Sequence, residues 1–437
     1  MPYRNIRLHP ILRLIYFFFR ALAWLGAGVF YRRRLVVGSD NFRFDGPAIV
    51  VTNHPSTLMD VLNPGLPIRQ EMFFLANYGL FKHPVSNWLL TRLYCIPVKR
   101  REDVAEGQER NNASAFKQSF VHLEKYGVLF IAAEGTSWMH RWVREFKTGA
   151  ARIAFGAENQ NKWKLDLKII PIGLSYSAPD LFRSDVVVNC GEAVRPRDWE
   201  DAWRQNPERA VDDLTAELQR RVTGLTIHTR DEEGEQLINR LEEMLKNEQP
   251  DDLKSTFLKV KHLAETRLDD EALRSKTDRY FDDLESARLS DLGIKSCLAP
   301  NVGLQTFADT LLLIAGFLPF AVGYAFWFLP CYLPWWLNKK LDLYIGYSST
   351  VKILGGLITF PIALWLAHKF LPGALGWPNT GMPIVLVLIA LGYFAELYMD
   401  RWRRVRERFK AGRFAAANPK KFEVLAALRG EILKELD

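Results

Sequence analysis

The stretch AIVVTNHPSTLMDVLNP (residues 48–64) begins as a buried strand and continues as a helix. Residues 48–52 are apolar and rich in β-branched side chains, a composition typical of a strand. The residues from about Ser56 onward favour a helix. A strand that leads directly into a helix is the repeating unit of an α/β domain. His54 therefore lies at a strand-to-helix junction, where α/β domains keep their functional sites.

The same alternation of short apolar runs and helical stretches extends from about residue 34 to residue 192. It predicts an α/β fold with a mostly parallel sheet flanked by helices, and we assign this α/β domain to residues 34–196. The predicted strands are residues 35–37, 48–52, 72–75, 96–99, 128–132, 168–171 and 185–189.

Two segments of different character flank this domain. Residues 1–33 contain an apolar run in which Arg13 and Arg20, seven residues apart, share one helical face. This pattern favours a helix in the membrane interface, with both arginines at the headgroups, over a spanning helix. Residues 197–300 are highly charged, with acids and bases mixed, and predict a helical arm with a solvated surface.

Residues 301–400 have the composition of membrane-embedded segments. The first apolar stretch contains Pro319, Pro330 and Pro334, which favour a broken, re-entrant hairpin over one straight span. The other two stretches are long enough to span a bilayer. The three predicted membrane segments are residues 303–337, 351–370 and 382–398.

Residues 401–437 begin with the strongly basic run RWRRVRERFKAGR (401–413). Basic segments beside membrane helices tend to stay in the cytoplasm. We therefore expect a cytoplasmic tail and an integral membrane protein whose α/β domain lies on the cytoplasmic face.

The net charge of +8 suits either nucleic acid or an anionic membrane surface. Because the cations concentrate beside membrane segments and the arm mixes both signs, we expect membrane lipid and no nucleic acid as a partner. The four cysteines are far apart and lack metal-ligand spacing, so neither a zinc site nor a disulfide framework is predicted.

His54 and Asp60 are six residues apart, which places them about 240° apart on an ideal helix. They can pair if His54 precedes the helix and folds back, so that Asp60 holds one imidazole nitrogen and the other acts as a base. Two alternatives stay open. One is a capping loop with Ser56 or Thr57 as N-cap, and the other is a metal-dependent hydrolase with His54 and Asp60 as ligands.

Three further segments carry polar residues next to predicted strands, and each has a plain structural explanation of its own. Lys99, Arg100 and Arg101 end one strand, where they could hold a phosphate or simply be solvated. The turn Glu134-Gly135-Thr136 follows another strand and could contact a ligand or be exposed. Pro171 lies in an apolar strand and marks an edge or a bulge.

Together, NHPSTLMD, CIPVKR, IAAEGTS and IIPIG resemble the four ordered blocks of the glycerol-phosphate and lysophosphatidate acyltransferase family, called PlsC-type, over residues 45–176. The chain departs from the commonest pattern in having five residues between His54 and Asp60, and Ala132-Ala133 before Glu134. A looser resemblance to the fungal glycerol-3-phosphate acyltransferases covers residues 112–116, FKTGAARIA (146–154) and the membrane segments that follow the catalytic domain.

The resemblance implies a role for each matching residue. His54 would be the general base and Asp60 its orienting partner, while Arg100, with Lys99 beside it, would bind the acceptor phosphate. The remaining residues would bind the substrates: Glu134, Gly135 and Thr136 the acceptor, and Pro171 the acyl-donor side.

The implied activity is a membrane-bound O-acyltransferase of phospholipid synthesis that uses no metal and no cofactor. It would move a fatty acyl group from acyl-CoA or acyl carrier protein to glycerol-3-phosphate or 1-acylglycerol-3-phosphate. The alternatives are another lysophospholipid or alcohol as acceptor, or a non-catalytic membrane scaffold whose charged arm binds a partner.

Overall fold

The computed structural model describes residues 10–92, 94–100, 103 and 111–436. The chain divides into two compact units. The sheet unit comprises residues 1–228 together with Tyr344–Thr350, and the helical unit comprises Thr229–Leu343 and Val351–Asp437.

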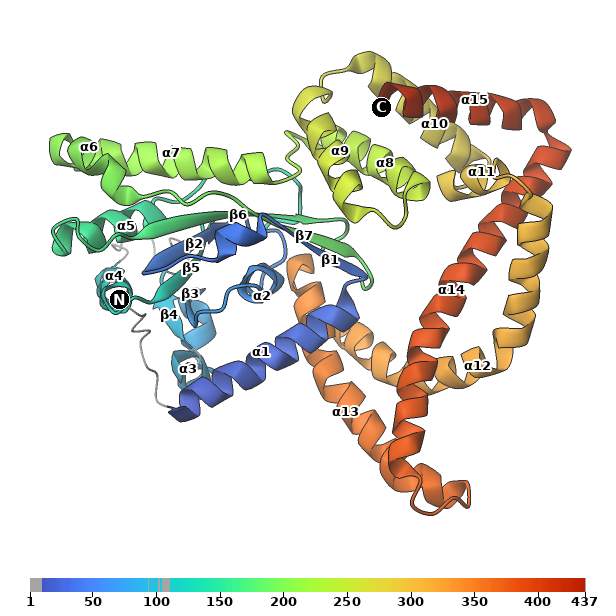
Figure 1. Ribbon diagram of the computed structural model, residues 1–437, viewed down its shortest axis with the longest axis horizontal. Helices are drawn as coiled ribbons and strands as arrows, with labels where there is room; N and C mark the ends of the chain where they lie inside the picture. The colour runs from blue at the N-terminus through green and yellow to red at the C-terminus, as the bar shows by residue number, and fades with distance from the viewer. Residues whose placement is uncertain (1–9, 93, 101–102, 104–110, 437) are drawn as a thin grey trace. The chain divides into compact units, whose positions relative to one another are not determined.

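Seven strands of the sheet unit form one sheet in the order β1-β7-β6-β2-β5-β3-β4 (Figure 1). Every neighbouring pair is parallel except β6 and β7. The predicted α/β fold and all seven predicted strands are therefore confirmed, although β6 continues beyond its predicted end. The strands are β1 (Arg33–Val37), β2 (Ala48–Thr52), β3 (Met72–Asn77), β4 (Cys95–Val98), β5 (Val128–Ala132), β6 (Lys168–Tyr176) and β7 (Asp185–Cys190).

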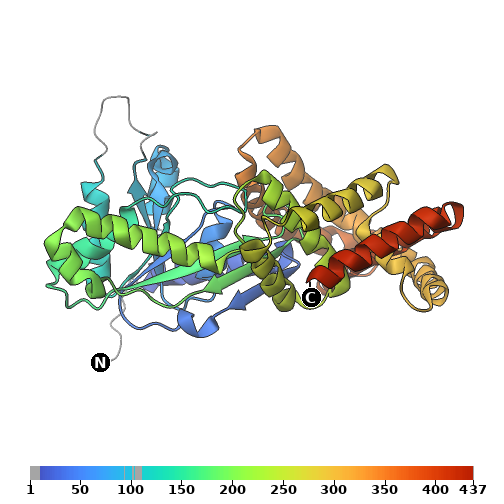
Figure 2. The same ribbon diagram turned by 90° about the horizontal axis from the view of Figure 1, so that it is seen from above.

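Helices cover both faces of this sheet (Figures 1 and 2). Ile49 and Val51 of β2 belong to one apolar cluster with residues of α4, α5 and α7, while Val50 points to the opposite face and is equally buried. Burial on both faces explains why the central strands are continuous apolar runs. The helices are α1 (Pro10–Phe30), α2 (Met59–Gly65), α3 (Pro84–Arg92), α4 (Ala113–Glu124), α5 (Gly149–Gln160), α6 (Glu200–Gln205) and α7 (Pro207–Leu225).

The sheet unit extends beyond the predicted domain end at residue 196, because α7 packs on the sheet. The apolar side chains of α7 recur every three to four residues and are buried in the cluster that holds Ile49 and Val51. The part of the predicted charged arm (197–300) that forms α7 therefore packs on the sheet, and its charged side chains lie on the opposite, solvated face of this helix. The residues of α7 in this cluster are Ala210, Val211, Leu214, Leu218 and Val222.

Two arginines of α1 contact neighbouring residues of the sheet unit, and their predicted place at the membrane headgroups stays a prediction. Arg13 forms an ion pair with Glu71 at 2.9 Å, and Arg20 donates to the carbonyl of Leu66 at 2.7 Å. The hydroxyl of Tyr16, on the same face, accepts a hydrogen bond from the N–H of Met72. The opposite face is apolar and exposed, at Leu14, Phe18 and Leu25 among others.

The helical unit contains a bundle of shorter helices, most of which begin with a side-chain cap. Asp231, Asp252, Asp270 and Ser290 each accept a hydrogen bond from a backbone N–H in the first turn. These helices are α8 (Glu232–Glu248), α9 (Leu253–Thr266), α10 (Glu271–Ser286), α11 (Asp291–Cys297) and α15 (Pro419–Leu436).

Three long apolar helices contain the three predicted membrane segments, and among the described residues they and α1 are the four helices long and apolar enough to cross a membrane. The segment predicted as a re-entrant hairpin is instead one helix of 40 residues that bends along its length (Figure 1). The long helices are α12 (Val302–Leu341), α13 (Ser348–Ala374) and α14 (Gly381–Ala417).

Neighbouring helices compensate for the prolines inside α12. The ring nitrogen of Pro334 cannot donate to the carbonyl of Pro330, four residues earlier, and Thr359 Oγ1 of α13 donates to that oxygen at 2.8 Å. Gly323 allows α12 to approach the backbone of Leu391 in α14 closely. The prolines are therefore accommodated within a continuous helix.

The basic run 401–413 continues α14 without a break, and α15 then packs against α10. The predicted tail is thus part of the helical bundle. Within that bundle Arg429 of α15 pairs with Asp291 at 2.7 Å, and Asp291 also accepts a hydrogen bond from Tyr280. All three side chains are buried.

Candidate functional site

His54 and Asp60 meet at the carboxyl end of β2. His54 lies on the loop that follows the strand, and Asp60 lies in the first turn of α2. His54 Nδ1 is 2.9 Å from Asp60 Oδ2, so the loop folds back as the six-residue spacing requires. Within the described part of the chain, Nε2 of His54 has no hydrogen-bond partner. The histidine side chain is 13% exposed and that of Asp60 is fully buried, so the pair presents one free imidazole nitrogen.

The carboxylate of Asp60 has two further donors. The N–H of Ser56 donates to Oδ2 at 2.6 Å, and the hydroxyl of Tyr176 donates to Oδ1 at 2.8 Å. Burial raises the pKa of Asp60, while the hydrogen bonds from His54, Ser56 and Tyr176 lower it. These donors fix the orientation of the carboxylate, and through it the plane of the imidazole ring.

Sequence reasoning did not identify Tyr176. The predicted strand ended at Pro171, but β6 continues past Ile172, which pairs with Thr52, and so carries Tyr176 beyond the end of β2. The sequence does carry a signal for this longer strand, because large apolar side chains alternate with small residues over 172–176. Asn53 supports this extension, since its side-chain amide donates to the carbonyl of Leu174 and accepts from the N–H of the same residue.

The capping-loop alternative does not agree with the geometry. Helix α2 begins at Met59, later than the predicted start near Ser56, and its N-cap residue Leu58 makes no side-chain cap. Ser56 Oγ is directed to the carbonyl of Pro179. The loop therefore positions His54 and Asp60 without capping the helix.

Glu134 supports the His54 loop from the neighbouring strand. It follows β5, which pairs with β2, and its Oε1 accepts a hydrogen bond from the N–H of His54 at 2.9 Å. On the other side of the same residue, the carbonyl of His54 accepts from the N–H of Trp138 at 2.9 Å. Gly135 between them has a φ of 78°, a left-handed conformation that favours glycine. The turn after β5 thus holds the backbone of His54 at both its amide and its carbonyl.

The environment of Glu134 makes the stability of the sheet unit depend on pH. Burial raises the pKa of Glu134 to about 7 from an ordinary value of 4.5, although the hydrogen bond from His54 lowers it. The folded state holds this proton more tightly than the unfolded state. The protonated carboxyl of Glu134 therefore contributes fully to the free energy of unfolding below about pH 4.5, and this contribution is lost as the pH rises through about 7.

We expect Glu134→Gln to remove this dependence, because the amide oxygen can still accept from His54 but carries no charge. Relative to wild type, the variant should gain up to about 3 kcal/mol of stability between about pH 5 and pH 8. Thermal unfolding at a series of pH values measures this gain, with the exposed Glu145→Gln as control. If the difference in stability between the variant and wild type is the same at the lowest and the highest pH, the prediction is wrong.

Lys99 and Arg100 follow the carboxyl end of β4, so they lie at the same end of the parallel strands as His54. Strand β4 is three positions from β2, which corresponds to about 14 Å. The side chain of Asn112 bonds to both the N–H and the carbonyl of Lys99, each at 2.9 Å, and the N–H of Arg100 donates to Asp103 at 2.8 Å. The third predicted cation, Arg101, lies outside the described residues.

The other two predicted contact residues have local partners. Thr136 Oγ1 accepts a hydrogen bond from the guanidinium of Arg144 at 3.0 Å. Pro171 lies in the buried interior strand β6, opposite Val51 of β2. The pairing next to Pro171 is irregular, but the extra residue lies in the neighbouring segment and not in β6, because three steps of β6, from Ile169 to Ile172, face four steps from Val194 to Cys190.

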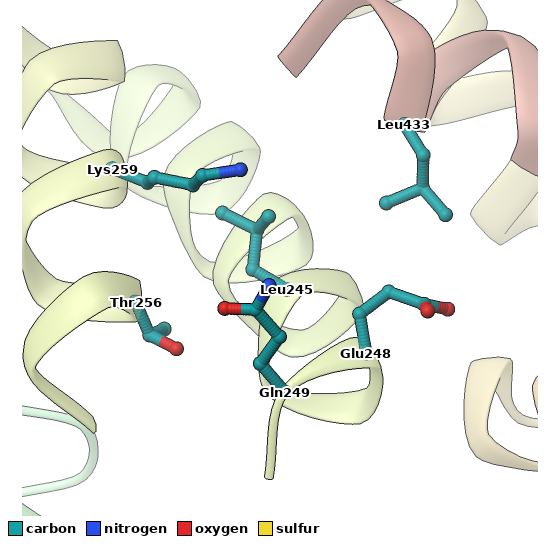
Figure 3. A pocket seen from close by; sticks show the side chains of 6 residues that line it. All are labelled: Leu245, Glu248, Gln249, Thr256, Lys259 and Leu433. Carbon is teal, nitrogen blue, oxygen red and sulfur yellow. The ribbon is translucent and has the colours of Figure 1, made fainter. Parts of the chain in front are cut away.

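Among the described residues, no group of three or more His, Cys, Asp or Glu side chains could hold a metal ion. A pocket of the helical unit lies among α8, α9 and α15 and contains none of the residues discussed above (Figure 3). Its lining residues are Leu245, Glu248, Gln249, Thr256, Lys259 and Leu433.

Part of the chain is similar to known proteins. Residues 33–175 match the family model described as Acyltransferase. The chloroplastic 1-acyl-sn-glycerol-3-phosphate acyltransferase BAT2 of Brassica napus is 26% identical over 158 residues, which span 36% of this chain and 41% of that relative. The LPA acyltransferase PlsC of Thermotoga maritima, a solved structure, aligns at 20% identity with a TM-score of 0.34, covering 49% of this chain and 86% of that chain.

Proposed function

Because this chain belongs, through residues 33–175, to the acyltransferase family of the PlsC type, we propose that it transfers a fatty acyl group from a thioester donor to a glycerol-phosphate-type acceptor. The donor is acyl-CoA or acyl carrier protein. The acceptor is glycerol-3-phosphate or 1-acylglycerol-3-phosphate, as in phospholipid synthesis.

The reaction follows from one free nitrogen on an oriented imidazole. His54 Nε2 removes the proton from the acceptor hydroxyl, and the oxygen attacks the thioester carbonyl carbon. The new C–O bond forms, the C–S bond breaks, and the leaving thiolate takes the proton back from the imidazolium. Asp60 holds the Nδ1 proton throughout and stabilises the positive charge on the ring.

The observation that carries the proposal is the contact of 2.9 Å between His54 Nδ1 and Asp60 Oδ2 inside the segment that matches the family model. A surface histidine needs no buried carboxylate partner. Here the carboxylate is fully buried and oriented by two other donors, an arrangement that supports a base with a fixed tautomer.

The four long apolar helices support a membrane location for this chemistry. The acyl chains of the substrate and product are lipids, so a site at the membrane surface avoids moving them through water. We further propose that the sheet unit faces the cytoplasm, since the basic run 401–413 is expected to stay on that side. Reporter fusions at Asn379 and Asp437 test this orientation, which an external signal at Asp437 would contradict.

The phosphate of the acceptor is assigned to Arg100, with Lys99 beside it. We expect Arg100→Ala to raise the KM for the acceptor about tenfold or more and to change kcat little, because the lost contact acts on binding. Arg69→Ala is the matched control. This exposed arginine precedes β3 and so lies at the amino end of the strands, away from His54. An unchanged KM in Arg100→Ala refutes the phosphate role.

Thiol release from acyl-CoA by the purified protein tests the function as a whole. Glycerol-3-phosphate, dihydroxyacetone phosphate, 1-acylglycerol-3-phosphate and a neutral lysophospholipid are compared in parallel, and acyl carrier protein is tested as a second donor. We expect release that depends on a phosphate-bearing acceptor and on His54. Failure with every acceptor and both donors would leave the membrane scaffold as the better interpretation.

A further inference from the structure

A short segment distant in sequence packs against the loop that carries His54. Residues Tyr344–Thr350 follow the apolar helix α12 and include the start of the apolar helix α13, yet they group with the sheet unit. They form one short helical turn, Ile345–Tyr347, followed by the first residues of α13. We call residues 344–350 the clamp segment.

The clamp segment makes three side-chain hydrogen bonds to loops at the site. Thr57 Oγ1 donates to the carbonyl of Gly346 at 3.0 Å. Because the single hydroxyl hydrogen of Thr57 is used in this way, Thr350 Oγ1, also 3.0 Å away, must be the donor to Thr57. Ser349 Oγ donates to the carbonyl of Pro179, to which Ser56 Oγ is also directed.

Thr57 is midway between His54 and Asp60 and has an unusual backbone. Its φ of 44° is left-handed, which a β-branched residue adopts only when its surroundings enforce it. Its N–H donates to Ser137 Oγ at 3.2 Å, so the turn after β5 holds the backbone while the clamp segment holds the hydroxyl. Thr57 is thus fixed from two sides by residues far from it in sequence.

We propose that the clamp segment is a positioning element for the His54–Asp60 pair. The catalytic part of this inference rests on the proposed function. The contacts of Thr350 and Gly346 with the Thr57 hydroxyl keep the loop in its left-handed turn, and that turn is what brings His54 Nδ1 onto Asp60. The residues that join two membrane helices therefore complete the active site, although they lie outside the segment that matches the family model.

The test uses Thr350→Val, which removes one hydroxyl and keeps the shape of the side chain. Thr350→Ser is the conservative variant. Thr359→Val is the matched control, because it makes the same change on the same helix at a hydroxyl that contacts Pro330. Two quantities are measured on the full-length protein: kcat and KM for acyl transfer, and the amide hydrogen exchange of a peptide spanning residues 53–62, which does not depend on any activity.

We expect Thr350→Val to lower kcat about three- to tenfold with little change in KM, and to speed exchange in the 53–62 peptide. Thr350→Ser and Thr359→Val should resemble wild type in both measurements. Thr57→Val should lower kcat similarly, and the double variant Thr57→Val/Thr350→Val should be no worse than Thr57→Val alone, because the two hydroxyls bond to each other.

Three outcomes overturn the proposal: unchanged exchange in Thr350→Val, faster exchange with unchanged kcat, or losses that add in the double variant. If the wild-type protein transfers no acyl group at all, the proposed function fails. The exchange measurement then still decides whether the clamp segment orders the loop.

Discussion

His54→Ala is expected to lower kcat by about 10²–10⁴-fold, the range that general-base catalysis typically contributes. The loss follows from the geometry, since His54 Nε2 is the free nitrogen of a ring whose other nitrogen is held by Asp60. The fold should persist, because the side chain is partly exposed and the backbone bonds of His54 to Glu134 and Trp138 are kept. Thiol release under saturating donor and acceptor measures kcat.

His262→Ala is the matched control for this variant. His262 is exposed on α9 of the helical unit, so the same substitution there should leave kcat unchanged. Thermal unfolding of both variants separates a catalytic loss from misfolding. If purified His54→Ala unfolds like wild type and keeps kcat within tenfold of it, the general-base assignment is wrong.

Asp60→Asn is expected to cost nearly as much, although it is almost isosteric. An amide can donate to Nδ1 of His54, which moves the ring proton to Nε2 and removes the base. The substitution also removes the charge that stabilises the imidazolium. We therefore expect a loss in kcat of about 10²–10⁴-fold with the KM for the acceptor little changed, measured in the same assay.

Tyr176→Phe provides a graded comparison for Asp60→Asn. It removes one donor to the Asp60 carboxylate and leaves the His54 contact in place, so the expected loss is about tenfold. Without that donor the carboxylate becomes more basic, and the acid limb of the pH–rate profile should move to higher pH. A full rate in Asp60→Asn would show that the carboxylate is structural, and an unmoved acid limb in Tyr176→Phe would show that Tyr176 acts by packing alone.

The strands and the order of the site segments could be read from the sequence, because both depend on local patterns. A central strand buried on both faces must be apolar along its length, so residues 48–52 and 128–132 are recognisable without their neighbours. The helical part was harder to divide. The charged face of α7 predicted a solvated helical arm, and the apolar stripe of this helix is buried only because the sheet covers it.

The pairing of His54 with Asp60 illustrates the limit of sequence reasoning. The spacing excluded a pairing across one helical face and required a folded-back loop, but it did not determine whether the loop folds back or caps the helix. That choice depends on Thr57, whose left-handed backbone is held by Ser137 and by the clamp segment.

By itself, the sequence determined the α/β class, the apolar helices and the four segments that carry the candidate site residues. The tertiary structure alone decided which further side chains contact the candidate site residues. The hydroxyl of Tyr176 reaches Asp60 across 116 residues, and Gly346 reaches Thr57 across 289. Hydrogen bonds between such distant residues produce no local pattern in the sequence. The order of the strands and the connections between helices decide which distant residues meet.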